Sequence, residues 1–464
     1  MYGDFSRFLD GLSGQYSGVL AQQGRLLLDA ELNEENAILL SYVRQLATDL
    51  IGPFGGPIHH AGFFVEPVIR DNKYRAVRLG GGHYYVYGLR CEAPAPHQPA
   101  NKEHSIGVHE VPFVVYLAVW EQSVSAIQAP ELIDPALRAD VPDTTRRSRV
   151  KWRPVADRRL PGRDDDLTEL DAEPISRAFH DYNSDPQRRP TLAARAHSGG
   201  SEPGPATAPV PWGYRGVENQ LYRVEVHDGG DRGDATFTWS RDNGSVELGL
   251  DGLTEPDGDG VRTATLQRIW YDRRQGLEVG DWVEFVDDHW APLGTPAPLM
   301  QVTGISLATR QVTLQDTKGR RDFDVAWHPL LRRWDQRPGG PAPSHGIPVQ
   351  QADRKWFELE DGVHIRFEAP TARYERGDYW MIPARTTTNS VLWPHSRDGH
   401  PGPLAIPPDG PSRYLAPLAL VQQLGAEPVD LRVLFGHLAE EHHASPESGG
   451  PARRRPRSPS RGRS

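Results

Sequence analysis

The sequence predicts a mainly β, multi-domain protein with an extended N-terminal arm and one long α-helix. Its body is expected to be β-sandwich or barrel-like, with an inserted small β-barrel. The chain has 464 residues, enough for two or three domains, and its 46 glycines and 42 prolines suit short strands joined by turns. Short apolar runs recur along most of its length, whereas strong helical periodicity is confined to one segment near the N-terminus.

That periodic segment is predicted to form a helix from about Asp29 to Ile51, after an arm over residues 1–24. One face carries apolar residues at spacings of seven, four, three and four, namely Leu32, Leu39, Val43, Leu46 and Leu50. Acidic residues in the first turns favour the helix dipole, and Gly52-Pro53 is a stop signal. The helix either packs on its own domain, or its outer face and the arm contact a partner subunit.

Changes in composition divide the rest of the chain. The expected units are the arm and helix (1–54), the first part of a β-rich domain (55–155), a long loop or linker (156–215), the second part of that domain (216–261), an inserted small β-barrel (262–318), a β-rich C-terminal unit (319–440) and a disordered arginine-rich tail (441–464). The apolar run at 113–120 is typical of a central strand buried on both faces. Three strands at short spacing predict the barrel.

Charge and cysteine content restrict the function classes. The net charge is −10, although residues 449–464 carry six arginines and no acid, so the folded body is more acidic still and nucleic acid is an improbable ligand for it. Cys91 is the only cysteine, in a pattern that predicts a buried, inert thiol. The sequence has no apolar run of membrane-span length and no secretory signal pattern, so we expect folding in the cytoplasm.

Motifs for chemistry are mostly missing. The sequence contains no phosphate-binding loop, dinucleotide fingerprint, HExxH, nucleophile elbow or paired CxxC, so no catalytic residue, cofactor or metal site is assigned. Two alternatives remain open. Glu121, Asp134, Asp143 and Glu218 are candidate carboxylates for a hydrolase, if the fold brings two of them together. Trp212, Trp334 and Trp393 lie near prolines and are candidates for a glycan-stacking surface, whereas Trp120, Trp239, Trp282 and Trp380 are expected in the core.

A family resemblance rests on several sequence segments. These are residues 16–20 (YSGVL), 22–25 (QQGR), 29–34 (DAELNE), 115–121 (VYLAVWE), 218–225 (ENQLYRVE), 239–245 (WSRDNGS) and 377–385 (GDYWMIPAR). Together, over roughly residues 1–435, the chain resembles an uncharacterised bacterial family whose genes lie beside those of phage-tail-like contractile injection systems. Tyr2 stands where that family usually has lysine, and Leu32 where it usually has tryptophan.

The resemblance implies a non-enzymatic structural or adaptor component of a tail-like particle, such as one at the baseplate or a fibre. Its expected partners are other subunits of the particle, with the protein oligomeric in an assembly that forms in the cytoplasm and can be released. The glycine-containing arm cannot form a core alone but carries apolar residues that would anchor it to a partner. The predicted partner-binding residues are Phe5, Phe8, Leu9, Tyr16, Gln22, Gln23 and Arg25.

Overall fold

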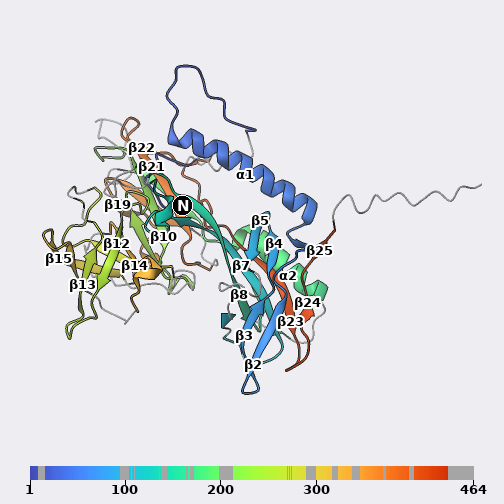
Figure 1. Cartoon of the computed structure of the whole chain (residues 1–464). Helices are drawn as coiled ribbons and strands as arrows, with labels where there is room; N and C mark the ends of the chain where they lie inside the picture. The colour runs from blue at the N-terminus through green and yellow to red at the C-terminus, as the bar shows by residue number, and fades with distance from the viewer. Residues whose placement is uncertain are drawn as a thin grey trace, which may run out of the picture.

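The computed structural model confirms a mainly β, multi-domain fold. It describes residues 1–8, 16–94, 104–105, 107–108, 110–134, 136, 144–163, 166–167, 172–197, 213–268, 270, 272, 274–288, 299–315, 322–336, 345–368, 373–396 and 402–436. Among these residues there are two α-helices, α1 (Asp29–Ile51) and α2 (Ala172–Ser184), and strands dominate the rest. The predicted long helix is confirmed at both ends. Figure 1 shows α1 lying along the outside of the molecule.

The first body surrounds one large apolar core. A four-stranded sheet has the order β24 (Val429–Asp430), β23 (Arg413–Val421), β7 (Phe113–Val124) and β8 (Arg147–Asp157). A second has the order β25 (Leu434–Phe435), β1 (Phe54–Pro57), β4 (Gly82–Val86) and β5 (Leu89–Ala93), and a third consists of β2 (Val65–Arg70), β3 (Lys73–Leu79) and β6 (His104–Ser105). Strand β7 pairs with β8 and β23 on its two edges, which confirms the central strand predicted there.

The second body is built from two sheets, one of five strands and one of three. The five-stranded sheet has the order β18 (Ile347–Pro348), β11 (Thr236–Ser240), β10 (Gln220–Val226), β21 (Tyr379–Arg385) and β22 (Ser390–Val391). The three-stranded sheet has the order β19 (Phe357–Glu360), β20 (Val363–Phe367) and β9 (Leu192–Ala196). Their apolar faces share a second core that is rich in aromatic residues, including Trp239, Phe237 and Trp380.

The small barrel is present but wider than expected. Its six strands close in the order β12 (Glu247–Leu253), β13 (Val261–Leu266), β16 (Gln311–Gln315), β15 (Leu299–Ser306), β14 (Trp282–Val286) and β17 (Leu330–Trp334). The barrel therefore extends beyond residues 262–318 on both sides. Closure depends on β12 and β17, which pair with each other from opposite ends of the segment. Such a long-range pairing leaves no local sequence signal.

The expected linker at 156–215 is more structured than its composition indicated. It contains α2, a 3-10 turn at Pro186–Arg188 and strand β9. Helix α2 buries Ile175, Ala178 and Phe179 in the first core. Their spacing of three and one fits one face of a helix, but the polar residues around them hid this pattern in the sequence. Residues 198–212 of this segment lie outside the described part, as does the predicted tail at 441–464.

Candidate interaction surface

Helix α1 begins and ends where its sequence signals stand. The backbone N–H of Leu28 donates to Glu31 (3.0 Å), and Asp29 accepts from the backbone N–H of Ser6 (2.9 Å). Gly52 ends the helix with a φ of 95°, and its N–H donates to the carbonyl of Thr48 (2.8 Å). A left-handed φ of this kind is readily adopted only by glycine. The helix is thus capped by local contacts at both ends, and its start is also tied to the arm through Ser6.

One face of α1 is turned toward the rest of the molecule and contacts the first body through Arg44. Ala30 and Ile38 are buried, and Arg44 forms an ion pair with Glu121 of β7 (2.8 Å). The backbone of Gly88 approaches Arg44 so closely that a Cβ there would lie 2.6 Å from its Cα, and the φ of Gly88 is 74°. Only glycine combines this positive φ with the absence of a Cβ that would collide with the backbone of Arg44. The inner face therefore sets the orientation of the helix.

The opposite face of α1 carries the predicted apolar stripe, and it is exposed. Leu39 is 61% exposed and Leu50 65% exposed, and Leu32, Val43 and Leu46 are each about half exposed. Tyr42 and Leu40 beside the stripe are exposed as well. At 100° per residue the stripe lies roughly opposite Ala30 and the other inner-face residues. The stripe does not pack on its own domain, which was the first of the two interpretations of this helix.

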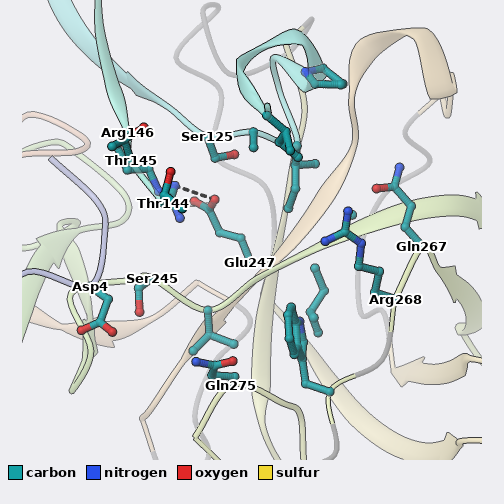
Figure 2. Close-up of a pocket in the computed structure, with 18 of the residues that line it drawn as sticks. Asp4, Ser125, Thr144, Thr145, Arg146, Ser245, Glu247, Gln267, Arg268 and Gln275 are labelled. Atoms are coloured by element: carbon teal, nitrogen blue, oxygen red, sulfur yellow. Dashed lines mark hydrogen bonds and ion pairs between the residues drawn. The ribbon is translucent and has the colours of Figure 1, made fainter. Parts of the chain in front are cut away.

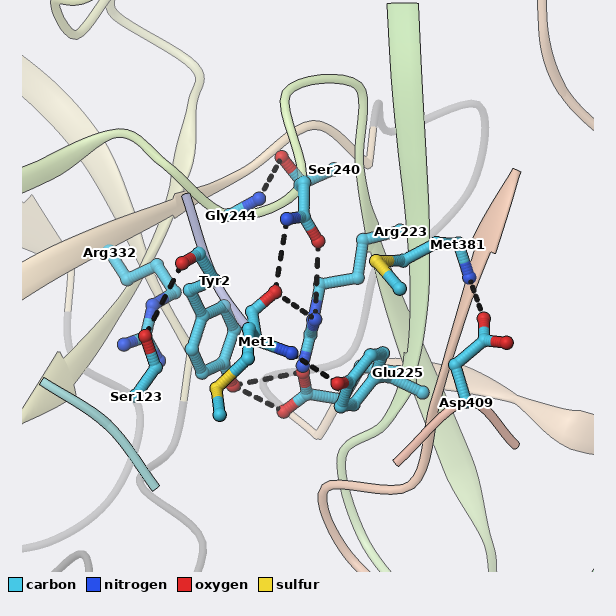
Figure 3. Close-up of polar contacts among 12 residues, drawn as sticks. Met1, Tyr2, Ser123, Arg223, Glu225, Ser240, Gly244, Arg332, Met381 and Asp409 are labelled. Atoms are coloured by element: carbon cyan, nitrogen blue, oxygen red, sulfur yellow. Dashed lines mark hydrogen bonds and ion pairs between the residues drawn. The ribbon is translucent and has the colours of Figure 1, made fainter. Parts of the chain in front are cut away.

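The beginning of the arm is anchored inside the molecule (Figure 3). The Tyr2 hydroxyl donates to both carboxylate oxygens of Glu225 (2.7 and 2.9 Å), and its ring lies between the guanidinium groups of Arg223 (4.0 Å) and Arg332 (3.7 Å). The Asn243 side chain donates to the carbonyls of Met1 and Gly3 (both 3.0 Å). Burial first, then Glu225, raises the pKa of the Tyr2 phenol, so the phenol remains protonated and acts as a donor.

Two sequence segments named for the family resemblance build this anchor. Residues 218–225 supply Arg223 and Glu225, and residues 239–245 supply Asn243 and the turn after it. Gly244 in that turn has a φ of 62°, and a Cβ on it would lie 2.7 Å from the Tyr2 ring. Sequence reasoning missed the anchoring role of Tyr2, because the two segments are more than 200 residues from it and nothing local links them.

The predicted partner-binding residues separate into two groups. Phe5 and Phe8 are partly buried and pack within the molecule against Leu221, Tyr379 and Met381. Leu9 lies outside the described residues. The remaining predicted residues are exposed in the arm, namely Tyr16, Gln22, Gln23 and Arg25. Within the described residues, the arm is attached at its start and largely exposed from Tyr16 to the start of α1.

A cavity of about 540 Å³, lined by both polar and apolar side chains, lies beside the arm (Figure 2). Asp242 and Glu247 both line it, and their pKa values shift in opposite directions. Burial and Asp335 raise the pKa of Asp242 to about 6. Burial also opposes ionisation of Glu247, but two arginines outweigh it and lower that pKa. Opposite shifts of this kind occur in acid–base pairs.

The arginine contacts favour a structural role for these two acids. The oxygens of Glu247 pair with Arg146 (2.7 Å) and Arg332 (2.9 Å). Asp242 pairs with Arg333 (3.2 Å) through one oxygen, and its other oxygen lies 3.9 Å from a nitrogen of Arg274. Each carboxylate oxygen thus faces a guanidinium group, and none is left directed at a ligand in the cavity.

The candidate carboxylates from the sequence occupy separate local roles. Glu121 pairs with Arg44, Glu218 pairs with Arg274 (3.1 Å), and Asp134 accepts from a backbone N–H two residues ahead. Asp143 lies outside the described residues. In the ranges that the structure describes, no three histidine, cysteine or acidic side chains gather closely enough to hold a metal ion.

The tryptophans give little support to a glycan-stacking surface. Trp334 lies in strand β17 rather than in a loop, and both Trp334 and Trp393 are buried. Trp212 lies outside the described residues. Trp239, Trp282 and Trp380 are buried as expected, whereas Trp120 is only half-buried. Cys91 is buried, as predicted, and burial raises the pKa of its thiol to about 12.

Comparison with known proteins identifies a family. The chain matches the family of unknown function DUF6519 over residues 1–160 and 162–427, and it therefore belongs to that family. No curated protein matches it. Among solved structures it is similar to one described as the crystal structure of TssK, with 10% sequence identity and a TM-score of 0.19, over 78% of this chain and 99% of that one. A TM-score this low supports no conclusion about fold or function. Neither helix of the described residues has the length and apolar character of a membrane span.

Proposed function

We propose that this protein is a non-enzymatic structural or adaptor subunit of a phage-tail-like contractile injection particle, and that it docks through the outer face of α1. One observation carries the proposal. A helix whose inner face is fixed by Ile38 and Arg44 presents an apolar stripe of five residues to solvent. The family resemblance of the sequence supplies the particle, in which such a subunit would be a baseplate or fibre component.

The energetic argument concerns the stripe. Burying a leucine side chain contributes roughly 1.5 to 3 kcal/mol. The stripe has four leucines and one valine, so covering it with a partner would contribute substantially to the free energy of binding. Contiguous exposed apolar surface usually marks an interaction site. The exposed arm adds Leu20 (90% exposed) and Leu26 (84% exposed) next to the start of the helix. The docking surface that we propose comprises the outer face of α1 and this part of the arm.

The rival functions have less support from the same residues. A carboxylate-dependent hydrolase would use Asp242 or Glu247, whose oxygens all face arginines. A glycan-binding module would use the candidate tryptophans, and the two of these candidates that the structure describes, Trp334 and Trp393, are buried. An assembly role requires neither kind of site.

The test is incorporation of a stripe variant into the particle. Leu39→Gln with Leu46→Gln removes two stripe leucines and keeps a good helix former at each position. We expect the variant to fold normally but to be missing from particles purified by sedimentation from the producing cells. The matched control is Leu307→Gln with Leu424→Gln, which changes two exposed leucines elsewhere and should be incorporated normally. Normal incorporation of the stripe variant would overturn the proposal.

A further inference from the structure

We propose that the partner of the α1 stripe is the α1 stripe of a second copy of this chain, paired parallel and in register as a two-stranded coiled coil. The inference rests on the proposed function only in that the outer face of α1 is the assembly surface. It adds the occupant of that surface and its orientation. Three features of α1 support it: the heptad spacing of the stripe, its single polar residue and the charges beside it.

The exposed residues of α1 follow a coiled-coil heptad. Leu32, Leu39 and Leu46 are seven residues apart and occupy the d positions. Asn36, Val43 and Leu50 are also seven residues apart and occupy the a positions between and after them. All six are exposed. Leucine at d with a β-branched residue at a, as at Val43, favours parallel two-stranded coiled coils. The spacing of four, three, four, three and four residues keeps one seam facing the partner.

Asn36 indicates which orientation the pair adopts. It is the one polar residue in the seam, and its amide nitrogen donates to the carbonyl of Leu32 (3.0 Å). In a parallel, in-register pair it would lie level with Asn36 of the second copy, and the two carboxamides would hydrogen-bond. In an antiparallel pair, a positions face d positions, and Asn36 would lie against Leu46. A buried amide opposite leucine costs free energy, so the polar residue selects the parallel register.

The charges beside the seam select the same orientation. The g positions are Glu35, Tyr42 and Asp49, and the e positions are Asn33, Leu40 and Ala47. A parallel pair places each g residue against the following e residue, so Glu35 meets Leu40 of the second copy. An antiparallel pair places g against g, so Glu35 would meet Asp49 of the second copy, and like charges repel.

The attachment of α1 leaves room for a second molecule. The inner face is held by buried Ala30 and Ile38 and by the Arg44–Glu121 ion pair, on the side opposite the seam. Two copies that share the seam would carry their bodies on opposite sides of the paired helices. The seam covers less than three heptads, which is short for a coiled coil. We therefore expect a dimer that dissociates on dilution.

Disulfide trapping tests the orientation directly. Val43→Cys places a thiol at an a position, where a parallel, in-register pair brings the two thiols within bonding distance. The native Cys91 is buried with a raised pKa and should not compete. We expect the Val43→Cys protein to form a covalent dimer on mild oxidation. The matched control, Gln45→Cys, is exposed on another face of α1 and should form no covalent dimer.

Two further measurements separate the possible outcomes. An antiparallel pair would place residue 39 of one copy against residue 43 of the other. Oxidation of a mixture of the Leu39→Cys and Val43→Cys proteins should therefore yield no mixed dimer if the helices are parallel. A mixed dimer without the Val43→Cys homodimer would overturn the parallel register. In sedimentation equilibrium we expect a reversible dimer for the wild type and a monomer for the Leu39→Gln/Leu46→Gln variant.

The same experiments distinguish this inference from the proposed function. A wild type that stays monomeric at all concentrations, with the stripe variant still missing from particles, would overturn self-pairing and leave the adaptor role standing. A trapped dimer with the stripe variant still incorporated would support self-pairing and overturn the docking role.

Discussion

At the scale of single residues, Tyr2 connects three parts of the chain that are distant in sequence. Its hydroxyl bonds to Glu225 of β10, its ring contacts Arg332 of β17, and its carbonyl accepts from Ser123 of β7 (3.3 Å). The first body, the second body and the barrel therefore meet around one residue. The arm begins with a structural anchor, although the sequence indicated a free docking segment.

Two substitutions distinguish the contribution of the Tyr2 ring to stability from that of its hydroxyl. Tyr2→Phe removes only the bonds to Glu225 and should lower the free energy of unfolding by about 1 to 3 kcal/mol. Tyr2→Ala also removes the ring and its cation–π contacts, and should cost more, about 3 to 5 kcal/mol. Urea unfolding of both variants measures the difference. Equal losses for the two would show that the ring contributes nothing beyond its hydroxyl.

Asp242 gives a prediction about pH. Its pKa is raised to about 6 in the folded protein, above its ordinary value of 3.8, so the folded state binds a proton more tightly than the unfolded state. Its contribution to stability is therefore present below about pH 4 and is lost as pH rises to about 6. Asp242→Asn removes this titration, so the stability of the variant relative to wild type should increase over that interval. Urea unfolding at several pH values measures it, and a constant difference would contradict the raised pKa.

At the scale of elements, α1 has two faces with different roles. Its inner face stabilises the fold, and its outer stripe contributes little to the stability of a single molecule. Adjacent residues show the contrast, since Ile38 is 5% exposed and Leu39 is 61% exposed. Periodicity in the sequence located the apolar stripe but did not indicate which face the body would cover.

Alanine substitutions at these neighbours form a matched pair. Ile38→Ala should lower the free energy of unfolding by about 2 to 5 kcal/mol, because it leaves a cavity against the body. Leu39→Ala should change it by no more than about 0.5 kcal/mol in dilute, monomeric solution. Chemical denaturation of both proteins makes the comparison. A large loss for Leu39→Ala would mean that the stripe packs within its own molecule.

At the scale of the whole molecule, buried ion pairs join the two bodies. Asp378, just before β21, is fully buried and accepts from Arg413 at the start of β23 (2.6 Å) and from Arg189 (2.9 Å). Burial raises the pKa of Asp378, and the two arginines oppose that rise. Strand β23 belongs to the first core and β21 to the second, so this acid couples the two.

Removing the charge of Asp378 should weaken that coupling. Asp378→Asn leaves Arg413 and Arg189 without their shared carboxylate, and breaking a buried pair of this kind costs about 3 to 5 kcal/mol. We expect calorimetry to show a lower melting temperature and separate transitions for the two bodies. Asp251→Asn, at an exposed pair with Arg310, is the control and should melt as wild type does. An unchanged single transition for Asp378→Asn would show that other contacts couple the bodies.

Local patterns accounted for the features that depend on neighbouring residues. The bounds of α1 follow from its periodicity, its first-turn acids and Gly52. The central position of β7 follows from its continuous apolar run. The burial of Cys91 follows from the alternating apolar residues around it. Of the candidate site, the sequence located the apolar stripe and the exposed part of the arm. It did not reveal that Phe5 and Phe8 pack within the molecule, because an apolar residue in an arm looks the same whether it packs inward or outward.

The sequence by itself determined the mainly β class, the length of the long helix and the residues of its stripe, because each is set within a few turns or one strand. Only the tertiary structure decided that the stripe faces solvent, that Tyr2 is held between Arg223 and Arg332, and that β12 closes the barrel against β17. These features depend on contacts between segments about 80 to more than 300 residues apart. Such contacts are selected by the packing of the whole chain, and no local spacing or composition records them.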